Sequence, residues 1–286
     1  MYKNNYYNKR IDVLAVRRLV FGVSVFLAAW FYVASTGWLS QQSRSAPVAQ
    51  MSIDMPLPVQ VVLAGGDRYL AANIGAFRAM VVGVERLDAI TLKTLSQVQM
   101  DAAALNPGHE DNYYMATAIL PWGGHVAPAQ TVLQAATAAR PTDVYPPFFY
   151  GFNLQYFLHD PVAASQALQV AAQRADEGNR AALKMIAAKW VAQSTDSEVA
   201  LAVLSQMKEE AKEPELKQVF AQRMERVKNM ALLRDGVRKY RQEFGVQPAS
   251  LDRVVAAGLL DAIPQDPLGG RYEVDRAGLV AVVMNR

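Results

Sequence analysis

Residues 106–141 read NPGHEDNYYMATAILPWGGHVAPAQTVLQAATAARP, and this stretch decides the expected fold. Two helix-forming segments, 110–121 and 127–139, lie on either side of a glycine pair. Asn106-Pro107 and Arg140-Pro141 lie 34 residues apart, and each proline ends a helix because it has no backbone N–H to donate. The stretch therefore predicts two antiparallel helices that repeat with a period of 34 residues.

Alanine-rich helical patterns continue on both sides of this stretch, from Asp67 to about Lys212. The predicted helices are short and have brief connections: 67–83, 88–105, 110–121, 127–139, 147–158, 161–176, 179–193 and 196–211. We therefore expect a mostly α fold in which helix pairs stack into an α-solenoid.

Within one period the chain resembles the tetratricopeptide repeat (TPR) family. Tyr113 stands at the aromatic position, Leu120 at the later large position and Gly124 in the turn. Ala129, Leu133 and Ala136 follow in register on the second helix, and Pro141 closes it. More degenerate units lie on either side, so that the resemblance covers residues 67–212. It implies TPR-like helix pairs that bind proteins as a scaffold, and it implies no catalytic residue.

The character of the chain changes after residue 212. Residues 213–245 form the longest helical pattern. Its interspersed basic and acidic residues are typical of an amphipathic packing helix, and a surface for an acidic partner is the alternative. Residues 246–286 predict a short helix followed by strands at 271–274 and 279–283. Asp266 lies between prolines and is predicted to be a turn residue.

Residues 246–286 resemble the C-terminal tail of the type II secretion major pseudopilins. The matching residues are Ile263-Pro264, Asp266-Pro267, Gly269-Gly270 and Tyr272. The methylation motif that precedes the apolar helix in that family is absent, because Arg17 and Arg18 stand there. The resemblance implies a small α/β tail that caps the helices, in a protein that is not itself a pilin.

Residues 19–39, LVFGVSVFLAAWFYVASTGWL, contain no charged residue. A helix of this length rises about 30 Å, the thickness of the hydrocarbon core of a bilayer. Five basic residues precede it: Lys3, Lys9, Arg10, Arg17 and Arg18. Basic residues that flank a membrane helix stay on its cytoplasmic side. We expect a single-pass protein of the bacterial inner membrane, with a cytoplasmic N-terminus and a periplasmic C-terminal domain. A cleaved signal peptide is the alternative.

The sequence thus predicts six segments. They are a cytoplasmic basic tail (1–18), a transmembrane helix (19–39), a linker (40–66), a TPR-like domain (67–212), a long amphipathic helix (213–245) and a pseudopilin-like tail (246–286). Within the linker, Val59–Leu63 is expected to be a strand or packed coil.

Composition and motifs exclude several classes of function. The net charge of +3 comes from the N-terminal tail, so the sequence pI of about 9.0 does not indicate nucleic-acid binding. The absence of cysteine excludes disulfides and thiolate metal sites. No nucleotide-binding or hydrolase motif is present, and the three histidines fall in predicted turns: His109, His125 and His159. We therefore expect no cofactor, no metal and no enzymatic activity.

An aromatic cluster suggests where partners bind. Residues 146–161, PPFFYGFNLQYFLHDP, carry six aromatic side chains on one predicted helix. Core packing is one interpretation of this cluster. The other is a groove, because first helices line the binding groove of TPR proteins and aromatics beside amides suit an extended peptide. The candidate partner-binding residues are Asn112, Tyr113, Tyr114, Tyr150, Asn153 and Tyr156. Tyr150, Asn153 and Tyr156 are expected to share one accessible face.

These features predict a membrane-anchored extracytoplasmic scaffold or assembly factor. Its partners are expected to be other proteins of a secretion, pilus or envelope-polymer export system, and the pseudopilin-like tail is what points to that setting. Two alternatives stay open: an accessory subunit or enzyme acting on envelope polysaccharide or peptidoglycan, and a purely structural subunit of a membrane complex.

Overall fold

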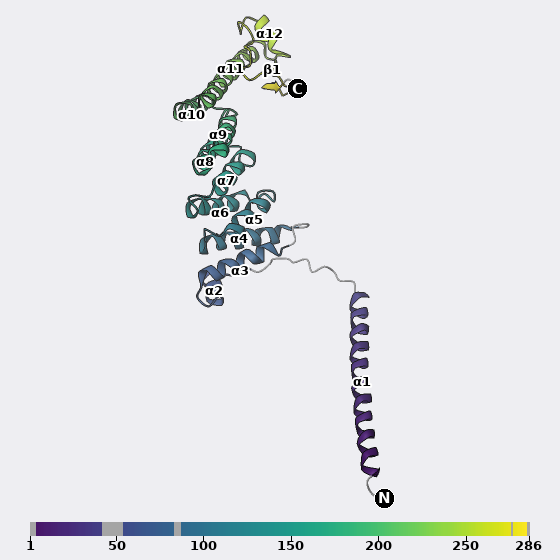
Figure 1. The fold of residues 1–286 in the computed structure, drawn as a ribbon. Helices are drawn as coiled ribbons and strands as arrows, with labels where there is room; N and C mark the ends of the chain where they lie inside the picture. The colour runs from purple at the N-terminus through teal and green to yellow at the C-terminus, as the bar shows by residue number, and fades with distance from the viewer. Residues whose placement is uncertain (1–3, 42–53, 83–86, 276, 285–286) are drawn as a thin grey trace. The chain divides into compact units, whose positions relative to one another are not determined.

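The computed structural model describes residues 4–41, 54–82, 87–275 and 277–284. These residues form twelve α-helices and one two-stranded sheet (Figure 1). The chain divides into two compact units, Met1–Ala49 and Gln50–Arg286. Each unit is described by itself.

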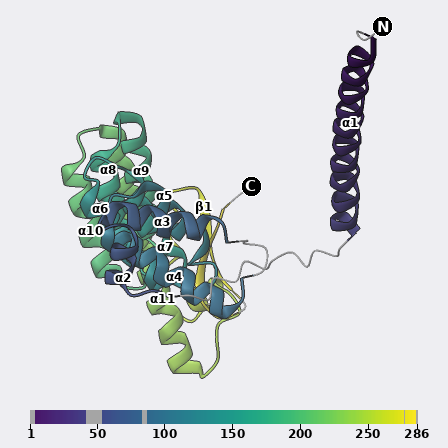
Figure 2. The same cartoon turned by 90° about the horizontal axis from the view of Figure 1, so that it is seen from below.

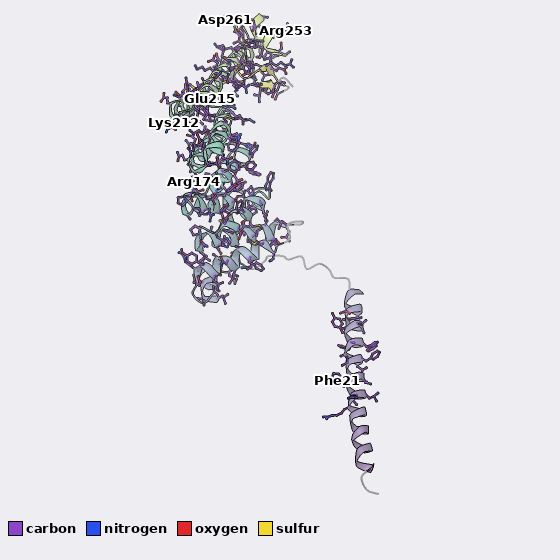
Figure 3. The ribbon with its side chains drawn as sticks, in the orientation of Figure 1. Phe21, Arg174, Lys212, Glu215, Arg253 and Asp261 are labelled. Atoms are coloured by element: carbon purple, nitrogen blue, oxygen red, sulfur yellow. The ribbon has the colours of Figure 1, made fainter. Side chains whose placement is uncertain are left out.

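The first unit consists of helix α1 (Asn4–Gln41). Its segment Arg17–Trp38 has a mean hydropathy of 1.8, and none of that segment is buried. Phe21, which Figure 3 labels on α1, is one of its exposed aromatic side chains. The described part of this unit is therefore a helix that is long and apolar enough to cross a bilayer.

The second unit begins with nine short helices. They are α2 (Leu57–Leu63), α3 (Arg68–Met80), α4 (Ala89–Leu105), α5 (Glu110–Ile119), α6 (Val126–Ala139), α7 (Tyr145–Tyr156), α8 (Pro161–Arg174), α9 (Glu177–Val191) and α10 (Ser197–Glu210). Each packs against the next helix in the chain, as Figures 1 and 2 show, and α4 also packs against α6. The eight helices predicted between residues 67 and 212 are confirmed, with small differences at their ends.

Helix α2 corrects the prediction of a strand or coil at Val59–Leu63. Pro56 stands at its N-cap and Pro58 in its first turn, where proline favours a helix start. The helix packs on α3 and α4, and Gln60 Nε2 donates a hydrogen bond of 2.7 Å to Asp101 Oδ2. The part of the predicted linker at 42–53 lies outside the described residues.

Aspartates fix the starts of most of these helices. An Asp side chain at the N-cap accepts a hydrogen bond from a backbone N–H of the first turn, which the helix itself leaves unpaired. Such caps begin α3, α4, α8, α9 and α10: Asp67, Asp88, Asp160, Asp176 and Asp196.

Small residues occupy the helix crossings. Ala129 and Ala136 of α6 are buried, which confirms that they face a neighbouring helix. A Cβ added at Gly151 of α7 would lie 2.6 Å from Leu168 Cδ1 and 3.0 Å from the Ala164 carbonyl oxygen of α8. Helices α7 and α8 can therefore approach this closely only with glycine at residue 151.

The long helix α11 (Pro214–Phe244) joins two hydrophobic cores. Its first half, through Phe220, packs with α7 to α10. Its second half, through Leu233, packs with α12 (Leu251–Ala256) and an antiparallel hairpin. The hairpin strands β1 (Gly270–Val274) and β2 (Val280–Met284) pair with Tyr272 opposite Val282, which confirms the predicted α/β tail.

A buried ion pair attaches this tail to α11. Arg226 donates to both carboxylate oxygens of Asp266, at 2.8 Å and 2.5 Å, and the Gly270 N–H donates to the same carboxylate at 2.6 Å. Burial alone would raise the pKa of Asp266, but these hydrogen bonds and the charge of Arg226 hold the pKa below its ordinary value. The prediction of a turn residue missed this role, because Arg226 lies 40 residues away in the sequence.

The crossing at Ala136 gives a test of the packing. We expect Ala136→Leu to lower the free energy of unfolding by about 1–3 kcal/mol, because the larger side chain must displace the opposing helix. The measurement is a thermal melt of the purified full chain in detergent. Ala138→Leu, on the exposed face of the same helix, is the control and should melt like the wild type. Equal melting of both variants would contradict the helix register.

Candidate partner-binding surface

Three of the six predicted binding residues are buried. Asn112, Tyr113 and Asn153 are 2%, 0% and 1% exposed. Asn112 Nδ2 donates to the Gln99 carbonyl oxygen at 2.9 Å, and Asn153 Nδ2 donates to Gln130 Oε1 at 3.2 Å. The expectation that Asn153 is accessible is therefore wrong. Its helix, α7, packs between α6 and α8, so its amide joins helices together and does not reach a partner.

Tyr113 belongs to a polar network between α5 and the α6–α7 turn. Its hydroxyl donates to Asp143 Oδ2 at 2.8 Å, and Arg140 Nε donates to the same oxygen at 2.7 Å. Burial, and then the bond to Asp143, raise the pKa of Tyr113. Burial alone would raise the pKa of Asp143, but the Tyr145 N–H, Arg140 and Tyr113 hold it below its ordinary value.

Two arginines 34 residues apart reach backward along the chain. Arg140 Nη1 donates to the Gly108 carbonyl oxygen at 3.1 Å. Arg174 Nη1, labelled in Figure 3, donates to the carbonyl oxygens of Arg140 and Asp143 at 3.1 Å and 3.0 Å. Arg140 caps the C-terminal end of α6 and Arg174 is the last residue of α8, and each donates to carbonyl oxygens of the preceding inter-helix turn. The 34-residue period contained this signal, but we did not predict these contacts from it.

The remaining predicted residues lie on different surfaces. Tyr114 is half-buried against Phe149, with ring centres 5.7 Å apart. Tyr150 is half-buried and lines a pocket of about 310 Å³ with residues of α6 and α8. Tyr156 is 56% exposed and meets Trp190 of α9 at 6.1 Å. Tyr150, Asn153 and Tyr156 therefore do not form the predicted accessible face.

An aromatic patch does reach solvent around Tyr156. We define it as Trp122, Phe152, Tyr156 and Phe157. Trp122 is 70% exposed and contacts Phe157 edge to face at 5.0 Å, and Phe152 contacts Tyr156 at 4.5 Å. Exposed aromatics held by other aromatics are rigid, and such side chains are enriched at the centres of protein interfaces. The sequence interpretation missed Trp122 because it lies in a turn and not on a helix.

The three histidines serve separate local roles. His109 Nδ1 accepts from the Asn112 N–H at 3.4 Å, His125 Nδ1 lies 2.8 Å from Ser96 Oγ, and His159 is an exposed turn residue with φ of 53°. Among the described residues, no three His, Asp or Glu side chains gather to form a set of metal ligands.

Comparison of the chain with protein-family models, curated proteins and solved structures found no match. The TPR-like and pseudopilin-like resemblances therefore rest on the residues quoted for them.

The Asp143 network predicts a pH-dependent stability. Asp143→Asn should lower the free energy of unfolding by about 1–3 kcal/mol at neutral pH, because Tyr113 and Arg140 lose a charged acceptor. The folded-state pKa of Asp143 lies below its ordinary 3.8, so its stabilisation is present above that value and is lost as the pH falls through the folded-state pKa. The difference in melting temperature from the wild type should therefore stay the same from about pH 7 to about pH 4 and shrink as the pH falls below 3.8. Asp261→Asn, at an exposed site, should show no difference at any pH, and a constant difference for Asp143→Asn would contradict the assignment.

Proposed function

We propose that the protein is a membrane-anchored scaffold or assembly factor that binds protein partners outside the cytoplasm. In this proposal α1 crosses the bacterial inner membrane once, the N-terminus is cytoplasmic, and residues 40–286 lie in the periplasm. The partners are subunits of a membrane or envelope machine. A secretion, pilus or polymer-export setting is suggested by the tail resemblance alone.

The apolar helix supports the anchor. Arg17–Trp38 is long enough to cross the hydrocarbon core and none of it is buried, whereas a core helix of a soluble protein would be mostly buried. Arg17 and Arg18 stand at its N-terminal end, which favours a cytoplasmic N-terminus.

The packing order supports a solenoid of TPR-like helix pairs. From α2 to α12 each helix contacts the next, and α3 with α5, α4 with α6 and α9 with α11 also contact. Neighbouring pairs that contact chiefly one another are the architecture of helical repeats, and the tail packs on the second half of α11, where a terminal cap would lie.

The exposed aromatic patch is the observation that carries partner binding. Trp122 and Tyr156 are 70% and 56% exposed, and both lie in one cluster of aromatic side chains. A protein that uses such a patch gains affinity by removing these rings from water. A tether to the membrane raises the local concentration of partners in the same membrane.

The topology gives a direct test. A reporter that is active only outside the cytoplasm should be active when fused after Arg286. The basic residues to move to positions 40–45 are Lys9, Arg10, Arg17 and Arg18. This change should lower the reporter activity, because the more basic flank of a membrane helix stays in the cytoplasm. The intact chain should stay with membranes in high salt. Release of a shorter, N-terminally trimmed product would establish a signal peptide instead.

The aromatic patch is tested by partner recovery. Chemical crosslinking in intact membranes, followed by quantitative mass spectrometry, measures the proteins held by the full chain. The Trp122→Ala/Tyr156→Ala double variant should lower the recovery of specific partners about tenfold or more, since central interface aromatics contribute about 2 kcal/mol. Its melting temperature should stay near that of the wild type.

Tyr69→Ala is the matched control, because Tyr69 is an exposed tyrosine on α3, outside the patch. Recovery that is unchanged in the folded double variant, or lowered equally in the control, would contradict a binding role for the patch.

A further inference from the structure

A groove lies along α11, between β2 and the C-terminal end of α9. Its first part has a volume of about 640 Å³ and its second about 460 Å³, and both are lined by Arg234. Residues of α9 and the following turn form one wall, and β2 forms the other. None of its lining residues belongs to the aromatic patch, although Gln193 on its wall accepts a hydrogen bond from Gln155 beside that patch.

The groove is basic. Six cationic side chains line it, and no acidic side chain does: Lys189, Arg223, Arg226, Arg234, Arg238 and Arg241. Two of them are neutralised locally, since Arg226 pairs with Asp266 and Arg238 with Asp235. The other four form no ion pair with any carboxylate of the described residues.

Arg223 is the cation of this groove that most lacks an anionic partner. Its Nε is buried and has no hydrogen-bond acceptor among the described residues. Burial, and then the charge of Arg226, lower the pKa of Arg223. A carboxylate placed beside Arg223 or beside Arg234 would accept hydrogen bonds from its guanidinium group, which matches the carboxylate with two parallel donors. The two arginines lie 11 residues apart on α11, about 16 Å along its axis, so each would take a separate carboxylate.

The remaining lining favours an extended peptide over a small anion. The tail supplies an apolar lining: Leu268, Leu279, Val280, Val282 and Met284. The cationic side chains come from α9 and α11, where Met230 and Val237 also line the groove. Successive side chains of an extended segment point to opposite sides, so one side can meet the cations while the other covers the apolar lining.

We propose that this groove binds an extended segment of a partner protein in which acidic and apolar residues alternate. The inference deepens the proposed scaffold function by giving the chemistry of one partner. The acidic residues point to one side of the extended segment and meet cations of α9 and α11, Lys189, Arg223 and Arg234, while the apolar residues on its other side cover the valine and methionine side chains of β2.

The test uses the purified full chain in detergent and a fluorescent peptide of about eight residues in which Glu and Val alternate. Fluorescence anisotropy should give saturable binding, and a peptide with Gln in place of Glu should bind at least about tenfold more weakly. The Arg223→Gln/Arg234→Gln double variant should weaken binding of the Glu peptide by about tenfold or more. The ion-paired Arg226 stays unchanged, so that the tail keeps its attachment.

Lys217→Gln/Lys228→Gln removes the same charge from the same helix at exposed positions outside the groove and is the matched control. An equal loss of affinity in this control would overturn the proposal, as would absence of peptide binding by the folded wild type. Stronger competition by inorganic phosphate, by phosphatidylglycerol in mixed micelles or by polyuridylate than by unlabelled peptide would also overturn it. Peptide binding is measured without reference to membrane topology. Absence of peptide binding would therefore not contradict the membrane anchor, and a different topology would not contradict peptide binding.

Discussion

The close approach of neighbouring helices is the constraint on which the second unit depends. Helices this short have little stability alone, so each must bury a face against the next one. Ala129 and Ala136 of α6 are fully buried, and Gly151 and Gly236 meet leucines of other elements at distances that exclude a Cβ. Where a small residue stands at a crossing, the flanking leucines and valines of both helices reach one another and form the cores.

Much of this fold could be predicted from the sequence, because local signals set the helix ends. Aspartate caps, prolines and glycine turns act within a few residues, so the helices from α3 to α10 were placed almost correctly. Contacts that join distant residues were not predictable in this way. The segment Val59–Leu63 was predicted to be a strand or packed coil, but packing on α3 and α4 makes it part of helix α2. Asp266 looked like a turn residue, since nothing nearby in the sequence indicated Arg226 as its partner.

The candidate surface shows the same division between local and distant signals. Helical spacing correctly placed Tyr150, Asn153 and Tyr156 on one helix, yet spacing does not tell which neighbour covers each face. Helix α7 contributes to two cores at once, with Tyr150 packed against both, so Asn153 became an internal residue. The accessible aromatic area instead includes Trp122, a turn residue that periodicity cannot identify. A surface for an acidic partner on the long helix was an alternative from the sequence, but the groove was not predictable, because its walls come from α9, α11 and β2.

Helix α11 connects the stability of the tail to the charge of the groove. One carboxylate, Asp266, is buried beside this helix, and it is fully used by Arg226 and the Gly270 N–H. That pairing and the apolar contacts of Tyr272 and Val280 hold the hairpin against α11 and thereby make β2 a wall of the groove. The pairing also leaves no acid to neutralise Arg223 or Arg234 in the part of the chain that the structure describes. A buried ion pair contributes little net stability. Apolar contacts would therefore stabilise the hairpin equally well if its only role were to cap a hydrophobic core. The pairing therefore accounts better for a hairpin that must be held at a fixed position beside a row of cations.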